Sequence, residues 1–212
     1  MLMAFGCQSL GIGTAVPLYF LLDYLQSPLE QILVSNYASV RLPAAKTLLP
    51  ALLLGYYLPL WAGFSPLLPA DRRMASLMWS FFGVLVPSLQ FPLAAISSTT
   101  PAKEKRPDMS YIRWTIMALI GISGISFQYA RLHVPAIPLS DLGFLQYDQL
   151  FAMLSCMIWI FLSFHDLQVY GVQISLLKVS AVLAGATVLG GPGVAFAVGW
   201  QWREEYIASI RG

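Results

Sequence analysis

Gln149-Leu-Phe-Ala-Met-Leu-Ser-Cys-Met-Ile-Trp-Ile-Phe-Leu-Ser-Phe-His165 contains no charged residue between Asp148 and the histidine that ends it. Its length approaches the roughly 20 apolar residues that carry a helix across the hydrocarbon of a bilayer. Apolar and polar residues do not alternate in it, which argues against a half-buried strand. Because every backbone amide in lipid must be paired within the segment, the run predicts a membrane-spanning helix.

Similar runs recur on both sides of this stretch. Including it, about six candidate spans lie at residues 3–25, 46–64, 74–96, 113–129, 149–165 and 176–200. The pattern predicts an all-α fold, namely a polytopic helical bundle that forms a single transmembrane domain over residues 1–212.

The composition agrees with lipid as the solvent. Of the 212 residues 58% are hydrophobic and 10% charged, with a mean hydropathy of +0.69, whereas soluble domains carry roughly 25% charged residues. A net charge of +2 with scattered basic residues argues against nucleic acid as a partner. Cys7 and Cys156 both lie in apolar runs and form no disulfide framework or metal cluster.

The longest polar break, residues 97–112, includes Lys103-Glu-Lys-Arg106 and predicts a charged extramembrane loop between two three-helix halves. Seven Lys and Arg residues fall on its side of the membrane and five on the other. The positive-inside rule therefore places this loop in the cytoplasm, together with the loops at 26–45 and 166–175. Both termini are then expected on the lumenal side.

Prolines and glycines interrupt the predicted spans. Each proline removes a backbone donor and predicts a helix kink; they are Pro17, Pro50, Pro59, Pro87, Pro92 and Pro192. In the last run, small residues four apart (Ala181/Gly185 and Ala186/Gly190) favour close helix packing. The alternative for Gly190-Gly-Pro-Gly193 is a helix break that exposes carbonyl groups.

Asp23 is the carboxylate that lies deepest in an apolar run, and intramembrane ionisable groups often face the bundle interior and serve a function. In a dry pocket it would be a candidate general acid. Tyr19 and Gln26, at i−4 and i+3, share its face and would orient it. The alternative is an interfacial aspartate near the end of a span, beside an aromatic-belt tyrosine and a loop glutamine.

Other ionisable residues bracket the fifth run and are expected at the membrane interface: Asp148, His165 and Asp166, with His133 and Asp141 before them. Asp148 and Asp166 are weaker candidates for catalysis. The two histidines are too far apart and lack paired carboxylates for a metal site. No phosphate loop, nucleophile elbow or aspartate-rich magnesium motif is present, so we expect no metal and no cofactor.

Aromatic residues cluster along the apolar runs. Tyr56 and Tyr57 lie in one run and Trp79 lies in the next, with Phe81 and Phe82 following it. Ring faces stabilise cations, so together with Tyr19 these side chains are candidates for lining a cavity for carbocation chemistry. The alternative is the interfacial belt of Trp and Tyr.

Three stretches carry a family resemblance: Gly11–Pro28, Leu42–Pro59 and Trp79–Gln90. The chain resembles the small multi-spanning membrane proteins of fungal indole-diterpene gene clusters, of the paxilline and lolitrem type. The resemblance implies a part in the biosynthesis of a terpenoid mycotoxin in an endomembrane such as the endoplasmic reticulum. It assigns no catalytic residue.

Two hypotheses follow, and the sequence does not decide whether the protein is an enzyme. In the first, a terpene-cyclase-like enzyme or accessory factor acts on an apolar isoprenoid intermediate, with Asp23 as proton donor. In the second, the protein is a scaffold for other pathway enzymes or a small carrier of the product, and the 97–112 loop is a docking or lipid-headgroup surface.

Overall fold

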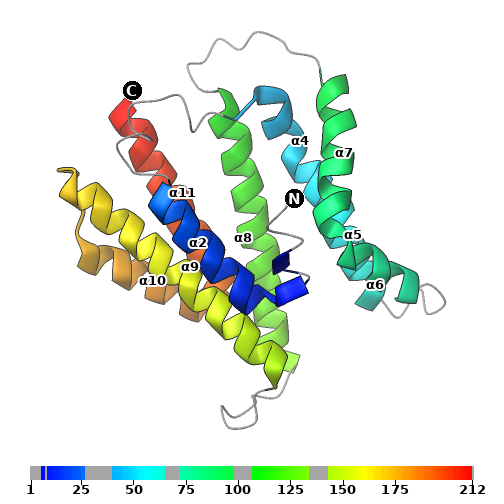
Figure 1. Ribbon diagram of the computed structural model, residues 1–212. Helices are drawn as coiled ribbons and strands as arrows, with labels where there is room; N and C mark the ends of the chain where they lie inside the picture. Colours follow the sequence, from blue (N-terminus) through cyan, green and yellow to red (C-terminus); the bar gives the residue numbers. More distant parts are fainter. Residues whose placement is uncertain are drawn as a thin grey trace. The chain divides into compact units, whose positions relative to one another are not determined.

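The computed structural model describes residues 6–7, 9–26, 40–64, 72–97, 107–133 and 143–211 (Figure 1). All regular secondary structure in these ranges is helical, which confirms the all-α prediction. The chain forms two compact units. Unit 1 comprises Met1–Gln8 and Ser39–Thr115, and unit 2 comprises Ser9–Ala38 and Ile116–Gly212.

The elements follow one another along the chain in this order: α2 (Ile12–Gln26), α4 (Leu42–Leu52), the π-helix η2 (Leu53–Tyr57), α5 (Leu58–Phe64), α6 (Arg72–Ser80), α7 (Phe82–Ile96), α8 (Pro107–His133), α9 (Phe144–Val169), α10 (Leu176–Gly190) and α11 (Pro192–Arg211). The boundary between the two units falls inside α8.

Unit 2 is built around α9. Ile160, Phe164 and Leu167 recur at i, i+4 and i+7, and all three are fully buried, as expected for the inward stripe of a helix. The core also contains Trp159, Ile174, Val179, Leu183 and Ile207. Helix α2 lies alongside α9 and runs in the same direction, because Ile12 contacts the start of α9 and Tyr24 contacts its end (Figure 1).

The predicted run 176–200 is divided at Gly191, so the helix break is the alternative that the structure supports. Gly191 has φ 87° and ψ 168°, a conformation that favours glycine. The carbonyl of Leu189 beside the break accepts a hydrogen bond from the Gln128 side chain of α8. Packing through small residues is not seen at Gly185, where no described atom lies within 4 Å of an added Cβ.

Unit 1 contains a π-helical segment between two prolines. Pro50 lies inside α4, and Pro59 has no N–H to give to the carbonyl of Gly55 one turn earlier. Between them the helix widens, and Leu58 donates to the carbonyl of Leu53, five residues back. Helix α7 packs closely here, since a Cβ on Gly55 would lie 3.0 Å from Val86.

About six spans are not supported. Among the described residues, two helices are long and apolar enough to cross a membrane, Met109–His133 of α8 and Gln146–Val169 of α9. The bent pair α6 and α7 would make a third. The other predicted runs do not form one long regular helix in the described ranges: α2 of the run 3–25 has 15 residues, 46–64 contains the π segment, and 176–200 breaks at Gly191.

The two long helices are consistent with a membrane protein. Large apolar side chains on α8 point outward, with Trp114 72% exposed and Ile125 74% exposed. Such a surface is unfavourable in water and suited to lipid.

The bend between α6 and α7 differs in its cause from the predicted proline kinks. Helices α6 and α7 meet at 75°, and the turn between them is at Phe81, which has φ −97° and ψ 17°. Pro87 and Pro92 lie farther on, inside α7.

Kinks at the individual prolines stay predictions. The single domain over 1–212 and the 97–112 loop also stay predictions, and most of that loop lies outside the described residues.

Candidate functional site

Asp148 of α9 caps the beginning of α2. Its Oδ2 accepts a hydrogen bond of 2.9 Å from the Ile12 N–H, and its Oδ1 accepts one of 2.7 Å from the Gly13 N–H. The carboxylate satisfies two of the unpaired donors of a helix N-terminus and complements its positive dipole end. Two parallel neighbouring helices place like dipole ends together, so this negative charge stabilises their pairing.

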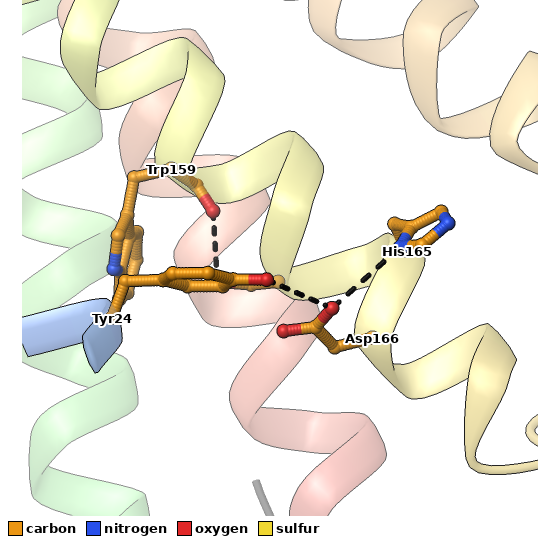
Figure 2. Close-up of polar contacts among 5 residues, drawn as sticks. Tyr24, Trp159, His165 and Asp166 are labelled. Atoms are coloured by element: carbon orange, nitrogen blue, oxygen red, sulfur yellow. Dashed lines mark hydrogen bonds and ion pairs between the residues drawn. The ribbon is translucent and has the colours of Figure 1, made fainter. Parts of the chain in front are cut away.

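The other end of the same helix pair holds three polar side chains in a row (Figure 2). The Tyr24 hydroxyl donates to Oδ1 of Asp166 over 3.2 Å, and Nδ1 of His165 lies 3.6 Å from the same oxygen. Asp166 is 30% exposed and His165 is 52% exposed. The sequence placed both at the interface, and the structure adds Tyr24 from α2 as their partner.

This Tyr24–Asp166–His165 group is suited to proton transfer. The Asp166 carboxylate accepts a hydrogen bond from the Tyr24 phenol on one side and lies near the His165 imidazole on the other. Partial exposure lets the group exchange protons with solvent. Asp166 is therefore a candidate general acid or base at one end of α9.

Asp23 and Tyr19 lie one turn apart on α2, as their spacing predicts. Asp23 is half-buried, Tyr19 is exposed, and among the described residues Asp23 makes no hydrogen bond or ion pair. Its role as general acid stays a prediction, whereas the side chain of its neighbour Tyr24 donates a hydrogen bond to the Asp166 carboxylate.

The three remaining cavity candidates come together in unit 1. The Tyr56 ring lies 5.0 Å from Tyr57, 6.2 Å from Trp79 and 5.3 Å from Phe82, measured between centroids. Nε1 of Trp79 is buried without a hydrogen-bond partner in the described part of the chain. This group belongs to unit 1, whereas Tyr19 and Asp23 belong to unit 2.

A second aromatic group, in unit 2, was missed from the sequence. Phe20 of α2 lies 4.9 Å from Trp159 and 5.7 Å from Phe196 between ring centroids. Above Trp159 lies the guanidinium of Arg203, with its Cζ 5.1 Å from the ring centroid. The spacing Phe196, Gly199, Arg203 would have placed the arginine on the inward face of α11, had the break at Gly191 been known.

Comparison with known proteins places the chain beside fungal enzymes. It is 28% identical to the FAD-dependent monooxygenase verC1 of Penicillium polonicum, over 99% of this chain and 29% of that protein. Identity is 27% to the FAD-dependent monooxygenases anuJ of Penicillium roqueforti and BOA8 of Botryotinia fuckeliana, over 95% of this chain and 28% and 29% of theirs. No family model and no solved structure matches.

These relatives support the fungal secondary-metabolite context that the resemblance implied. They do not support the narrower assignment to indole-diterpene clusters. They are named FAD-dependent monooxygenases, not indole-diterpene membrane proteins. The chain spans less than a third of the length of the relatives it matches.

The described residues do not fit FAD. Dinucleotide-binding folds hold the pyrophosphate between a strand and the N-terminus of a helix, on a glycine-rich turn, and no strand occurs in the described ranges. At Gly11-Ile-Gly13 the N–H groups of α2 are already bonded to the Asp148 carboxylate, whose charge would repel a phosphate. Within the same ranges no three His, Cys, Asp or Glu residues gather to hold a metal ion.

Proposed function

We propose that this chain is a membrane-bound helical module of fungal secondary metabolism that works beside a FAD-dependent monooxygenase on an apolar, prenylated intermediate. The observation that carries the proposal is the alignment of nearly the whole chain with less than a third of proteins named for that activity. Because the described helices do not fit FAD, the flavin is assigned to the part of such proteins that this chain does not match.

The lipid-facing helices suit an apolar substrate. Monooxygenases add oxygen to carbon, and an epoxide formed on an isoprenoid opens when an acid protonates its oxygen. Proton transfer to that oxygen breaks a C–O bond and leaves a carbocation, which a neighbouring alkene attacks. This attack closes a ring and moves the positive charge to another carbon. Loss of a proton from that cation then gives a neutral product. The proposal adds this terpene-cyclase-like step, on an intermediate of the indole-diterpene type in the endoplasmic reticulum.

Two carboxylates are proposed for the proton. Asp23 remains the first candidate, with Tyr19 on the same helix proposed beside the cation. Tyr56, Tyr57 and Trp79 are proposed as a separate aromatic lining for a cation in unit 1. Asp166 is the second candidate, because its contacts with Tyr24 and His165 provide a route for the proton to return. Each carboxylate has an uncharged counterpart in asparagine, which retains shape and loses the acid.

The test is the metabolite profile of a fungal host that runs the pathway with and without this protein. We expect an oxygenated, uncyclised intermediate to accumulate without it and to be converted when the protein is restored. Asp23→Asn or Asp166→Asn should block conversion if that residue is the acid, while the protein still accumulates in membranes. Full conversion by both variants would overturn the acid step.

A non-enzymatic role is the second candidate, and the relatives favour it. The relatives are more than three times as long as the segment that they share with this chain, and they are named as flavin enzymes. In them the shared segment and the rest of the enzyme belong to one polypeptide. We propose that this chain likewise works beside a monooxygenase, without catalysing a step of its own. In this case the protein is a scaffold or carrier that brings enzyme and apolar substrate to the membrane.

The scaffold role is tested by co-purification with the pathway's monooxygenase from fungal membranes. Replacing Lys103-Glu-Lys-Arg106 with a neutral linker should release the enzyme and leave the helical bundle intact. Undiminished co-purification would argue against that loop as the docking surface. Identical compounds in changed amounts, with both carboxylate variants active, would favour the scaffold over the acid.

A further inference from the structure

Arg203 lies on the buried stripe of α11. Ala195, Gly199, Arg203 and Ile207 recur every four residues, and all four are buried in unit 2. Such a stripe normally holds apolar side chains that face a neighbouring helix. Gly199 confirms the neighbour, because a Cβ there would lie 2.9 Å from Ile160 of α9. An arginine therefore occupies a position that packing alone would give to a hydrophobic residue.

The depth of this arginine is unusual. Its guanidinium lies 5.1 Å from the ring of Trp159, and Trp159 is near the middle of the candidate span Gln146–Val169. The side chain is only 11% exposed. A charge held at such depth is costly, and arginines of this kind commonly pair with a group that the function requires.

The donors of Arg203 exceed the acceptors that the described residues offer. A guanidinium carries five N–H groups. Nη1 donates to Oε1 of Glu204 over 2.6 Å. In the described part of the chain this is the one hydrogen bond that the Arg203 side chain makes. Nε is buried with no partner in the same ranges. The Trp159 ring face stabilises the charge but accepts no full hydrogen bond.

We propose that Arg203 binds the anionic oxygen of an apolar ligand, such as the carboxylate of a lipophilic acid, with Trp159 beneath the guanidinium. The planar fork of arginine matches a carboxylate and binds it through two hydrogen bonds. Glu204 holds the guanidinium until the ligand arrives and competes with it. The proposal concerns binding and stands apart from the acid step proposed above.

The experiment uses the purified full chain in uncharged detergent micelles and dibromostearic acid, whose bromine atoms quench nearby tryptophan fluorescence. We expect saturable quenching by the acid and at least about tenfold weaker binding of its methyl ester, which keeps the apolar body and loses the charge. Trp159→Phe should remove part of the quenched emission. Equal binding of acid and ester by the native protein would overturn the proposal without any variant.

Two substitutions have opposite expected effects. Arg203→Gln should weaken acid binding about tenfold or more and leave ester binding unchanged, and Arg203→Lys should restore part of it. Glu204→Gln removes the competing carboxylate and should strengthen acid binding. Weaker acid binding in Glu204→Gln, or unchanged binding in a folded Arg203→Gln, would show that the pair is structural.

The natural source of the anionic oxygen is either a membrane lipid or a free acid. Competition with the anionic lipid phosphatidylglycerol, against neutral phosphatidylcholine as control, distinguishes them. Displacement of dibromostearic acid by phosphatidylglycerol alone supports a lipid at this site. Resistance to both lipids, with displacement by unlabelled stearic acid, supports a free lipophilic acid.

Discussion

Gly191 is the residue whose replacement the structure penalises most clearly. Its backbone is in a region that side-chain-bearing residues rarely adopt, and a Cβ would lie 2.6 Å from the Phe127 ring. Gly191→Ala is expected to lower the free energy of unfolding by more than the roughly 1–3 kcal/mol of the backbone strain alone. Thermal unfolding in detergent measures the difference.

Two other glycines serve as controls for that experiment. Gly171 also has a positive φ of 90°, but no described atom lies within 4 Å of an added Cβ, so Gly171→Ala reports strain without a clash. Gly185 is helical and equally uncrowded, so Gly185→Ala should be neutral or slightly stabilising. If all three variants unfold alike, the contact between Gly191 and Phe127 is not a native one.

Asp148 gives a second residue-scale prediction. In Asp148→Asn one carboxylate oxygen becomes an NH₂ donor that faces a backbone N–H, so the start of α2 should lose about 1 kcal/mol of local stability. Hydrogen–deuterium exchange at Ile12 and Gly13 should become faster. Asp166→Asn is the matched control, because its amide oxygen still accepts from Tyr24 and it leaves those two N–H groups untouched. Equal exchange in both variants would contradict the cap.

Among the described elements, α8 and α9 are the two single helices that are candidates for crossing a membrane. Both are long enough to cross, and they follow each other in the chain, so they should cross in opposite directions. On a background with Cys7→Ser and Cys156→Ser, cysteines at Ser97 and Val169 should react with a membrane-impermeant maleimide from the cytoplasmic side. A cysteine at His133 should react from the lumenal side. Labelling of Ser97 and His133 from one side would mean that α8 does not span.

The elements also show what hydropathy predicts and what it leaves open. Apolar runs locate helices well, because a buried backbone must be paired whatever its neighbours are. They do not determine span length, because Phe81 and Gly191 change direction through local backbone conformation rather than through polarity. The π segment between Pro50 and Pro59 depends on which backbone carbonyl loses its hydrogen-bond donor. Hydropathy averaged over a window of residues does not contain that information.

The same limit applies to the site residues. Asp23 was prominent because it interrupts an apolar run, whereas Asp148 and Asp166 were at the run's ends. Only the pairing of α2 with α9, which involves residues far apart in the chain, shows that Asp148 caps one end and Asp166 engages Tyr24 at the other. Arg203 was hidden for a similar reason, since its burial depends on the direction that α11 takes after Gly191.

On the scale of the whole molecule, the question is where the flavin chemistry of the relatives resides. A chain that matches 28% to 29% of their length need not contain the site for which they are named. The helical fold of the described residues and the use of the α2 N-terminus by Asp148 both argue against a pyrophosphate site. Membrane attachment and substrate handling are then the roles that we propose for the matched segment.

This division predicts that the chain, expressed alone in a fungal host and purified from membranes, carries no stoichiometric FAD. Denaturing the sample and measuring released flavin absorbance checks it, with a FAD-dependent monooxygenase taken through the same procedure as positive control. Asp148→Asn should not create flavin binding, because freeing one N–H group supplies neither a strand nor a glycine-rich turn. Retention of FAD by the native chain, lost on mutation of Gly11 or Gly13, would place the cofactor in this segment and overturn the division.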